Sequence, residues 1–476
     1  MQKVQTGPDR DLSPTRWQTS LHRRWLPAIL ALVLFALSLR WNLAAVHDSA
    51  FHPDESRWLN RAHYLADILE PTGPTWRDQY LIRGQPPVGS YIVGLGLVLQ
   101  GRDLETNEAW VFERGDHRNV VWNVVKGAMP SQDDLEAGRR TSAVIGALTV
   151  VTLFLLVTRL SNWVGGVIGA LFFAIHPLQT YLAGLAVADA AFTFIVALTT
   201  LSFAALASKP TWPRAILTGV LLGIGAGTKL SPLFLAIPFA GLGLALLSDN
   251  LLRRLPLVGR LWSLLHPTPT HADRRLGWLL LTLPIVATTF FVVSYPYLWP
   301  APLERTRYLF KFRQDEMANQ ARIFPWAAID SRFEALERMW TMLTEHYSAT
   351  GRIVARIGEA IGRDWSGFGI DIPIAVAGLA LLMFAVLRRG VTSSHGLTAA
   401  ALAGQCALIL GVLRVDFDRY YLPIVFTFAV GIGYLISQIA IGVETLIARR
   451  TVRSQLRPAA SVLSTRSLPQ PIERRS

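Results

Sequence analysis

The sequence predicts an all-α integral membrane protein with about ten transmembrane helices and further helices lying along its outer face. The chain has 476 residues, of which 51% are hydrophobic, and its mean hydropathy is +0.34. Several long apolar segments lack charge, and each is long enough to cross a hydrocarbon core of about 30 Å. Basic residues gather at the ends of these segments, as the positive-inside rule expects of a membrane protein.

Ten apolar segments of roughly 15 to 22 residues follow one another along the chain. They are 26–46, 140–160, 163–179, 185–207, 214–228, 230–247, 276–297, 369–387, 396–413 and 420–440. The run 214–247 is divided in two, because one helix of that length would be about 50 Å long. Gly225, Gly227 and Pro232 also interrupt it. We therefore expect two short spans with Lys229 in the turn between them.

The distribution of charge sets the expected orientation. The tails 1–25 and 448–476 are basic, so we expect both in the cytoplasm, the second disordered, on either side of a membrane domain over 26–447. The first run continues past Arg40 without a clear cleavage site, which favours a retained anchor over a signal peptide. Ten spans return the C-terminus to the cytoplasm. Two long loops then lie on the outer side, 47–138 and 298–365.

The outer loops contain helices of their own. Segment 101–137 has eight acidic and four basic residues, which fits an outer position, so the short apolar stretch 87–99 should lie along the membrane. In 298–365 an apolar stripe at helical spacing predicts either an interfacial helix or a helix packed on the other outer loops. The stripe consists of Phe333, Leu336, Trp340, Leu343 and Tyr347.

Composition and spacing exclude several functions. The net charge of +13 arises from basic residues at the ends of spans, so it does not indicate a nucleic-acid partner. The one cysteine, Cys406, lies in an apolar run and is expected to pack there. The histidines lack the spacing of zinc ligands, and no phosphate-binding or dinucleotide-binding glycine motif occurs.

Asp54 and Glu55 form an acidic pair directly after the first span. Two adjacent carboxylates do not help membrane insertion, whereas they suit chemistry on a substrate held at the outer surface. The alternative is an N-cap with an acidic first turn of the helix that follows. Asp189 is a second candidate, because an ionisable residue beside a long apolar run is expensive at membrane depth. It too could be a helix N-cap.

Three cations on the outer side are candidate anion ligands. Lys229 lies in an apolar turn where the positive-inside rule disfavours it, although it could simply extend its amine to water. Arg83 and Arg419 suit bidentate contact with phosphate. Either arginine could instead pair with nearby acids, and Asp416 and Asp418 are the obvious partners of Arg419.

Carboxylates and cations together on the outer side favour sugar transfer. Nucleotide sugars are cytoplasmic, so a transferase working outside needs a donor that crosses the membrane, and a sugar linked to a lipid phosphate fits. Phosphate leaves without a general acid, so one carboxylate suffices as base for the acceptor hydroxyl. Cations must then hold the departing phosphate.

Short motifs in a fixed order give a resemblance to a known family. They are Asp54-Glu55, Gln85-Pro86-Pro87, Arg139-Arg140-Thr141-Ser142-Ala143, His176-Pro177 with Asp189, Gly227-Thr228-Lys229, and Arg419-Tyr420 with Pro423. At these motifs the sequence resembles the GT-C glycosyltransferases, specifically the protein O-mannosyltransferase and lipid A aminoarabinose transferase group (glycosyltransferase family 39-like). The resemblance covers most of the chain.

The resemblance implies a GT-C-like fold and inverting transfer of mannose or a similar sugar from a polyprenyl-phosphate carrier. It implies that Asp54 is the base and that Asp189 positions acceptor or base, with Glu55 beside them. Lys229, Arg83 and Arg419 would contact the donor phosphate. No inserted luminal domain interrupts 298–365, unlike in the eukaryotic protein mannosyltransferases, which suggests an enzyme of a prokaryotic plasma membrane.

Other functions stay open at this stage. The acceptor could be a protein, a lipid or a glycan, and a divalent cation such as Mg²⁺ or Mn²⁺ could assist, although no metal site is predicted. A lipid-linked saccharide ligase would use a pyrophosphate-linked donor in the same architecture. A transporter would move lipid or sugar without catalysis, but its charged sites are expected near the bilayer midplane rather than at one face.

Overall fold

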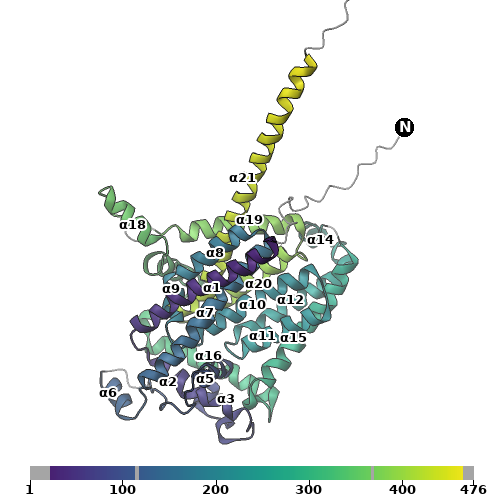
Figure 1. The fold of residues 1–476 in the computed structure, drawn as a ribbon. Helices are drawn as coiled ribbons and strands as arrows, with labels where there is room; N and C mark the ends of the chain where they lie inside the picture. Colours follow the sequence, from purple (N-terminus) through teal and green to yellow (C-terminus); the bar gives the residue numbers. More distant parts are fainter. Residues whose placement is uncertain (1–21, 113–116, 268, 366–368, 465–476) are drawn as a thin grey trace, which may run out of the picture.

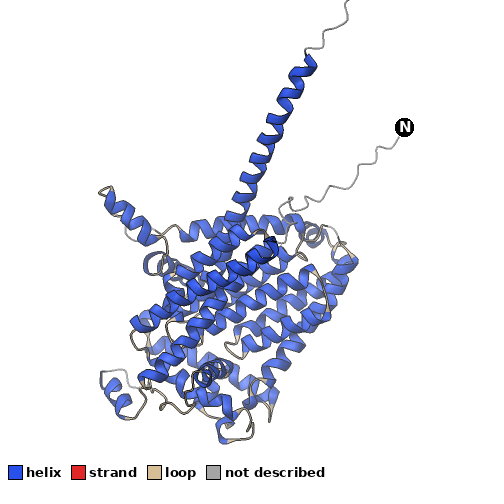
Figure 2. Cartoon of the chain, in the orientation of Figure 1, coloured by secondary structure: helices blue, strands red, loops and turns tan. Residues whose placement is uncertain are grey.

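The computed structural model describes residues 22–112, 117–267, 269–365 and 369–464. Over these residues the regular structure is helical, and the one β-type contact is an isolated antiparallel bridge between Ala328 and Val415 (Figure 2). The helices form one bundle, with α2, α3 and α6 at one end and α14 at the other (Figure 1). We call these the α2 end and the α14 end. The all-α fold predicted from the sequence is confirmed.

Seven helices of the described chain are long and apolar enough to cross a membrane, or eight if a bent pair counts as one span. The seven are α1 (His22–Asp48), α7 (Gln132–Leu160), α10 (Asp189–Ser208), α15 (His271–Val293), α19 (Asp371–Arg389), α20 (Ser394–Val412) and α21 (Leu422–Ser464). The pair is α8 (Trp163–Ile175) and α9 (Pro177–Ala183), which meet at 63°. Pro177 follows the bend, because its ring disfavours helical backbone at the residue before it.

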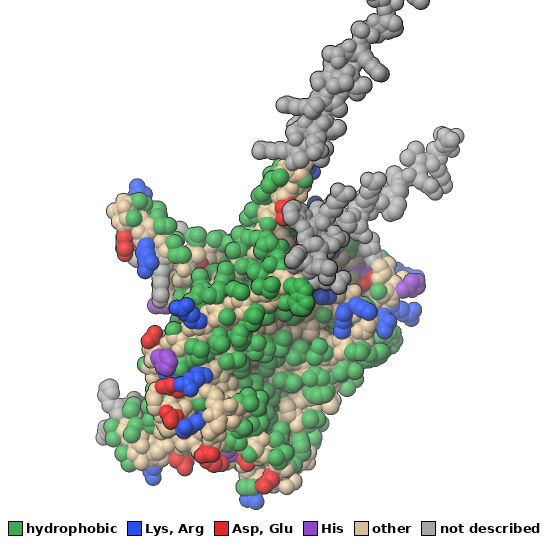
Figure 3. Space-filling model, in the orientation of Figure 1, with side chains coloured by type: hydrophobic (Ala, Val, Ile, Leu, Met, Phe, Trp, Pro, Cys, Tyr) green, Lys and Arg blue, Asp and Glu red, His purple; other side chains and the backbone are tan. Residues whose placement is uncertain are grey.

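Two shorter apolar helices complete the set of ten segments that the sequence predicts. They are α11 (Trp212–Ala226) and α12 (Ser231–Leu247), and Lys229 lies in the turn between them. Hydrophobic side chains cover the middle of the bundle and charged ones its ends, which is the distribution expected of a membrane-spanning protein (Figure 3).

Small residues allow the spans to approach closely. α19 packs along α21, and a Cβ added to Gly378 would lie 1.8 Å from the carbonyl oxygen of Gly431. α12 packs along α15 in the same way, with Gly243 against Gly277. Such contacts are how membrane helices gain van der Waals packing where the hydrophobic effect does not drive association.

Short helices build the α2 end from the first outer loop. They are α2 (Pro53–Asn60), the 3-10 turn η2 (Arg61–His63), α3 (Tyr64–Asp67), η3 (Pro74–Trp76), α4 (Tyr80–Gly84), α5 (Val88–Leu99) and α6 (His117–Val125). α5 has 12 residues, so it is about 18 Å long and too short to cross a bilayer. It packs against α7, and its expected orientation along the membrane stays a prediction.

The second long loop is also helical. It contains α16 (Pro302–Ile323), η5 (Pro325–Ala327), α17 (Arg332–Thr341), a π-helical turn η6 (Met342–His346) and α18 (Gly351–Ala360). The predicted stripe lies on α17, on η6 and on Tyr347 directly after it, and the choice between an interfacial and a packed helix stays a prediction. Phe333, Leu336 and Trp340 are exposed, whereas Leu343 is buried.

Further short helices lie outside these regions. They are α13 (Asp249–Leu252), α14 (Pro256–Leu265), η4 (Pro296–Leu298) and η7 (Asp418–Tyr421). α21 continues to Ser464, so the expected disorder from residue 448 is wrong as far as that residue. No glycine or proline interrupts 443–457, and helical backbone therefore extends past the span. The rest of both basic tails lies outside the described residues.

Candidate functional site

α2 begins where the chain leaves the first span. Pro53 occupies its first position, and the His52 ring nitrogen Nδ1 accepts a hydrogen bond from the Asp54 backbone N–H at 3.1 Å. The Glu55 carboxylate accepts from the His52 backbone N–H at 2.9 Å, which completes a capping box. This cap fixes the first turn, and with it the positions of both carboxylates of the acidic pair.

Glu55 is the fully buried member of the pair. The Arg139 guanidinium donates to both of its oxygens, from Nε at 2.7 Å and from Nη2 at 2.8 Å. The Ala186 backbone N–H donates at 2.8 Å. Arg139 also donates to three carbonyl oxygens in and just after the last turn of α1, those of Val46, Ser49 and Ala50. Glu55 therefore joins α2 to α7 and to the chain before α10, and its contacts are those of a positioning residue, unlike the catalytic role predicted for it.

Asp54 points the other way and forms an ion pair with Arg419. Its side chain keeps 14% of its surface exposed and that of Arg419 keeps 23%. Asp418 accepts a hydrogen bond from the Tyr347 hydroxyl at 2.6 Å, and Asp416 accepts one from Tyr421 at 2.6 Å. The expected pairing of Arg419 with one of those two acids is therefore replaced by a pairing with Asp54.

Asp189 and Lys229 form a second ion pair. Asp189 is the first residue of α10 and is nearly buried, while Lys229 follows α11 and is 27% exposed. The N-cap of α10 is Ala188, and no side chain caps it. The alternative of Asp189 as a simple N-cap is therefore wrong, and the lysine that the positive-inside rule disfavours faces a carboxylate.

Tyr420 brings the two ion pairs together. Its ring centroid lies 5.2 Å from Nζ of Lys229 and 5.6 Å from Cζ of Arg419, both within reach of a cation–π contact. We call Asp54, Arg419, Tyr420, Lys229 and Asp189 the outer charge site. It unites the start of α2, the start of α10, the turn between α11 and α12, and η7, which directly precedes α21.

His52 responds to this site electrostatically. Burial lowers its pKa below the usual value, and the positive charge of Arg419 lowers it further, against opposing effects of Glu55, Asp418 and Asp189. A neutral imidazole agrees with its role as a hydrogen-bond acceptor at the cap. His52 thus keeps an uncharged ring at neutral pH, next to the two carboxylates of the acidic pair.

Arg83 lies outside the outer charge site. Its Nε is 3.5 Å from Asp78, and its guanidinium stacks on Tyr308 and Phe312 of α16. The structure therefore does not bring the three predicted phosphate ligands together.

Three further arginines share the region around Arg83. Arg61 donates to the Gln85 side chain at 2.7 Å, and Arg313 donates to the Gly84 carbonyl at 2.6 Å. Arg57 lies 5.6 Å over the Tyr80 ring, which in turn contacts Phe312. We call Arg57, Arg61, Arg83 and Arg313 the arginine cluster.

Arg61 is 2% exposed and has no carboxylate partner among the described residues. Burial lowers its pKa to about 10, with Arg57 and Arg313 adding repulsion. Arg57 follows Asp54 by three residues on α2, so the arginine cluster adjoins the outer charge site along one helix. The sequence analysis missed Arg57 and Arg61, although the helical spacing from Asp54 was a signal that could have indicated them.

No three His, Cys, Asp or Glu side chains of the described chain are grouped so that they could hold a metal ion. Each of the three predicted carboxylates pairs with a cation instead: Glu55 with Arg139, Asp54 with Arg419 and Asp189 with Lys229. The predicted assistance by Mg²⁺ or Mn²⁺ stays a prediction.

Comparison with known families supports the resemblance inferred above. Residues 130–270 match the model of the family described as dolichyl-phosphate-mannose-protein mannosyltransferase. The matched part includes Arg139, Asp189 and Lys229 and leaves out Asp54 and Arg419. No curated protein sequence matches the chain. The predicted resemblance to the protein O-mannosyltransferase group is confirmed over residues 130–270.

Two groups of solved structures are similar to the chain. The archaeal oligosaccharyltransferase AglB from Archaeoglobus fulgidus, solved with an inhibitory peptide and a dolichol-phosphate, gives a TM-score of 0.49 and 13% identity over 91% of this chain and 52% of that one. ArnT from Cupriavidus metallidurans, bound to undecaprenyl phosphate, gives a TM-score of 0.45 and 15% identity. The match covers 94% of this chain and 67% of that one. The chain thus spans about half the length of the oligosaccharyltransferase. At these scores neither likeness adds to the case for an activity.

Proposed function

We propose that the protein is a membrane glycosyltransferase that moves a sugar, mannose or a similar one, from a polyprenyl-phosphate carrier to an acceptor hydroxyl, with inversion. The observation that supports this most is the outer charge site, where Asp54 and Asp189 each face one cation around a shared tyrosine ring. Each carboxylate keeps oxygen lone pairs available, which a base or an acceptor-binding group requires.

Asp54 is the base in this proposal. One of its oxygens takes the proton of the acceptor hydroxyl as the hydroxyl oxygen attacks the anomeric carbon. The bond between that carbon and the phosphate oxygen breaks, and the departing lipid phosphate takes the electron pair. Arg419 and Lys229 lie beside the two carboxylates and would hold the negative charge that develops on the phosphate. Asp189 positions the acceptor or the base.

The arginine cluster extends the cationic surface from the outer charge site along α2. Arg57, Arg83 and Arg313 are partly exposed, so they are available to a phosphate, whereas Arg61 is buried behind them. We propose that Arg83 acts in donor binding as part of this cluster rather than beside Lys229 and Arg419. Guanidinium groups suit this task because their planar fork matches two phosphate oxygens.

The setting we propose is a prokaryotic plasma membrane, with both termini in the cytoplasm and the outer charge site on the outer face. The acceptor is a protein, a lipid or a glycan that presents a hydroxyl at that face. The membrane-spanning architecture and the position of the outer charge site at the α2 end support this setting.

A transfer assay tests the proposal. Purified protein in detergent receives radiolabelled polyprenyl-phosphate mannose and extracted membranes as acceptor, beside the Asp54→Asn variant and the exposed control Asp133→Asn. Label should move to a new product with wild type and Asp133→Asn, and not with Asp54→Asn. Transfer from a pyrophosphate-linked donor alone would replace the proposal with a saccharide ligase. Translocation of labelled lipid without a new glycosidic bond would replace it with a transporter.

A further inference from the structure

A cavity of about 380 Å³ opens at the α14 end, far from the outer charge site. Trp212, His271, Arg274, Arg275, Trp278 and Leu279 line it. Trp212 is the first residue of α11, whose other end leads to Lys229. The other five lining residues belong to the start of α15. The cavity therefore lies across the bundle from the proposed chemistry.

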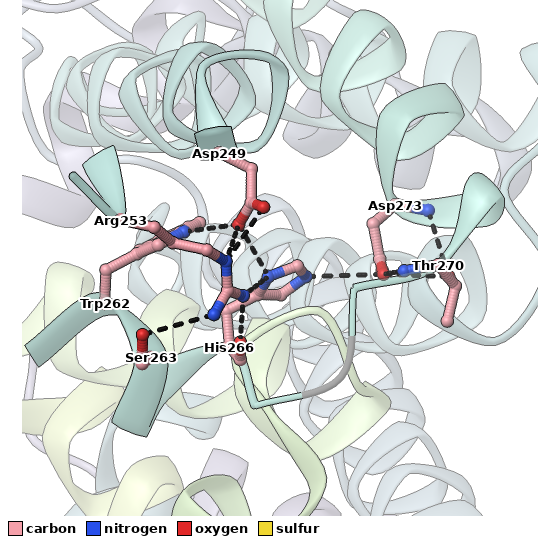
Figure 4. Close-up of polar contacts among 7 residues, drawn as sticks. All are labelled: Asp249, Arg253, Trp262, Ser263, His266, Thr270 and Asp273. Carbon is pink, nitrogen blue, oxygen red and sulfur yellow. Dashed lines mark hydrogen bonds and ion pairs between the residues drawn. The ribbon is translucent and has the colours of Figure 1, made fainter. Parts of the chain in front are cut away.

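The two arginines of the cavity have no carboxylate partner among the described residues, and both are exposed. The acids nearest to them in the chain are engaged elsewhere (Figure 4). Asp273 accepts from the Thr270 backbone N–H at 2.6 Å and lies 3.3 Å from His266. Asp249 pairs with Arg253 at 2.9 Å. Two adjacent guanidinium groups are thus left to attract an anion from outside the protein.

Tryptophans frame the arginines. Trp212 is 51% exposed and Trp278 is 57% exposed, at the level where a span begins. Tryptophan is enriched where bilayer headgroups meet acyl chains, because its ring is apolar and its N–H is polar. Exposed Ile216 and Leu217 on α11 and Ile285 on α15 continue toward the middle of the bundle. From the end of the bundle toward its middle, the surface thus changes from basic to aromatic to apolar. A ligand with a charged head and long apolar chains matches this order.

Figure 3 shows the same arrangement on a larger scale. Lys and Arg side chains gather at its right-hand edge, around the position that α14 has in Figure 1, directly beside the hydrophobic middle. Basic groups between spans attract anionic lipid headgroups, since each contributes electrostatic attraction to the negatively charged leaflet.

We propose that this cavity binds one anionic phospholipid, with Arg274 and Arg275 on its phosphate, Trp212 and Trp278 on its glycerol backbone, and its acyl chains along α11 and α15. The site does not depend on the proposed transferase activity. The apolar continuation of the cavity favours a lipid over a free phosphate ion, which would contact the arginines alone.

Native mass spectrometry of the full chain, released from detergent with added phosphatidylglycerol or phosphatidylcholine, tests the site. Wild type should retain one phosphatidylglycerol molecule in preference to phosphatidylcholine. Arg274→Gln with Arg275→Gln should weaken retention about thirtyfold, which corresponds to about 2 kcal/mol for two basic groups at an anionic surface. Arg388→Gln, an exposed arginine at the end of α19, is the matched control and should retain the lipid.

A second variant and a competitor make the test sharper. Trp278→Ala leaves the net charge unchanged and should still reduce retention, whereas a site made by charge alone would be unaffected. Inorganic phosphate at millimolar concentration should not displace the lipid. Equal retention of both lipids, equal losses in the control, or displacement by free phosphate would each overturn the proposal. All variants are compared after gel filtration confirms folded protein.

Discussion

Charged side chains meet at both ends of the bundle, yet the two groups differ in how completely they are bonded. At the α14 end, Asp249 accepts from Arg253 and from the Trp262 indole, and His266 lies between Asp249 and Asp273 at 3.3 Å from each (Figure 4). At the α2 end, Asp54 and Asp189 each face a single cation. We call the carboxylates of the first group saturated, because each has several internal partners, whereas Asp54 and Asp189 each pair with one cation.

This difference distinguishes carboxylates that stabilise the fold from carboxylates that can react with a substrate. A saturated carboxylate has given its lone pairs to the fold, so it can hold helices together but cannot take a proton from a substrate. Glu55 belongs to this saturated class although it adjoins Asp54 in the sequence, because Arg139 and backbone N–H groups occupy it. Saturated charges should therefore matter for stability and unsaturated ones for activity.

The largest expected effect is on stability at the saturated Glu55–Arg139 pair. Arg139→Gln leaves a buried carboxylate without its partner and should lower the free energy of unfolding by about 3 to 5 kcal/mol. Arg140→Gln is the matched control, since Arg140 pairs with Glu136 at the surface and its loss should cost less than about 1 kcal/mol. Thermal unfolding in detergent measures both, and equal effects would break the distinction.

A loss of activity should follow at the unsaturated Lys229. Lys229→Gln removes a cation that we place beside the departing phosphate, so kcat should fall by about 100-fold to 1000-fold. Lys126→Gln, another lysine of the α2 end, should transfer sugar normally. If the Lys229 variant unfolded early with its transfer rate intact, Lys229 would belong with the saturated charges.

Asp249, in the saturated group at the α14 end, should affect stability and leave activity unchanged. Burial raises the pKa of Asp249, but hydrogen bonds from Arg253 and Trp262 outweigh it and lower the pKa overall. Asp249→Asn should therefore reduce the free energy of unfolding at pH 7 by about 1 to 3 kcal/mol. The reduction should shrink as the pH falls below about 4, where the unfolded wild-type carboxyl is already protonated. Transfer activity of the folded variant, measured beside the exposed control Asp315→Asn, should be unchanged.

The smallest effect concerns His52 and acid. Its pKa is lowered, so below about pH 6.5 the unfolded chain takes up a proton that the folded chain resists, and stability falls. His52→Asn preserves a capping oxygen without titrating. Because the ring is 41% exposed, the wild type should lose less than about 1 kcal/mol relative to this variant between pH 8 and pH 5. A constant difference over that range would show that His52 does not titrate as proposed.

Much of the fold was predictable because hydropathy and charge act locally. All ten apolar segments became helices, and the division of 214–247 at Lys229 followed from glycine, proline and helix length. Asp189 and Lys229 were found because each is costly in its apolar surroundings. Side-chain partners were less predictable, because they depend on packing between distant segments. Glu55 and Arg139 are 84 residues apart, and Arg419 pairs with Asp54 rather than with the adjacent Asp418.

The arginine cluster shows the same limit. Arg61 has no acid to indicate its importance. It donates to Gln85, which follows α4, and Arg313 of α16 donates to the neighbouring Gly84, so distant segments form the cluster. Arg83 was recognised as a cation, but its position on Tyr308 and Phe312 separates it from Lys229.

The neighbours Asp54 and Glu55 give the most direct test of the comparison. Asp54→Asn and Glu55→Gln are the same chemical change one residue apart, and both variants are assayed for sugar transfer and for thermal unfolding. Asp54→Asn should lose transfer by about 100-fold to 10,000-fold with an unfolding temperature near that of wild type. Glu55→Gln should unfold at a clearly lower temperature, and its folded fraction should still transfer sugar. Normal transfer by Asp54→Asn, or abolished transfer by a stably folded Glu55→Gln, would contradict the assignment.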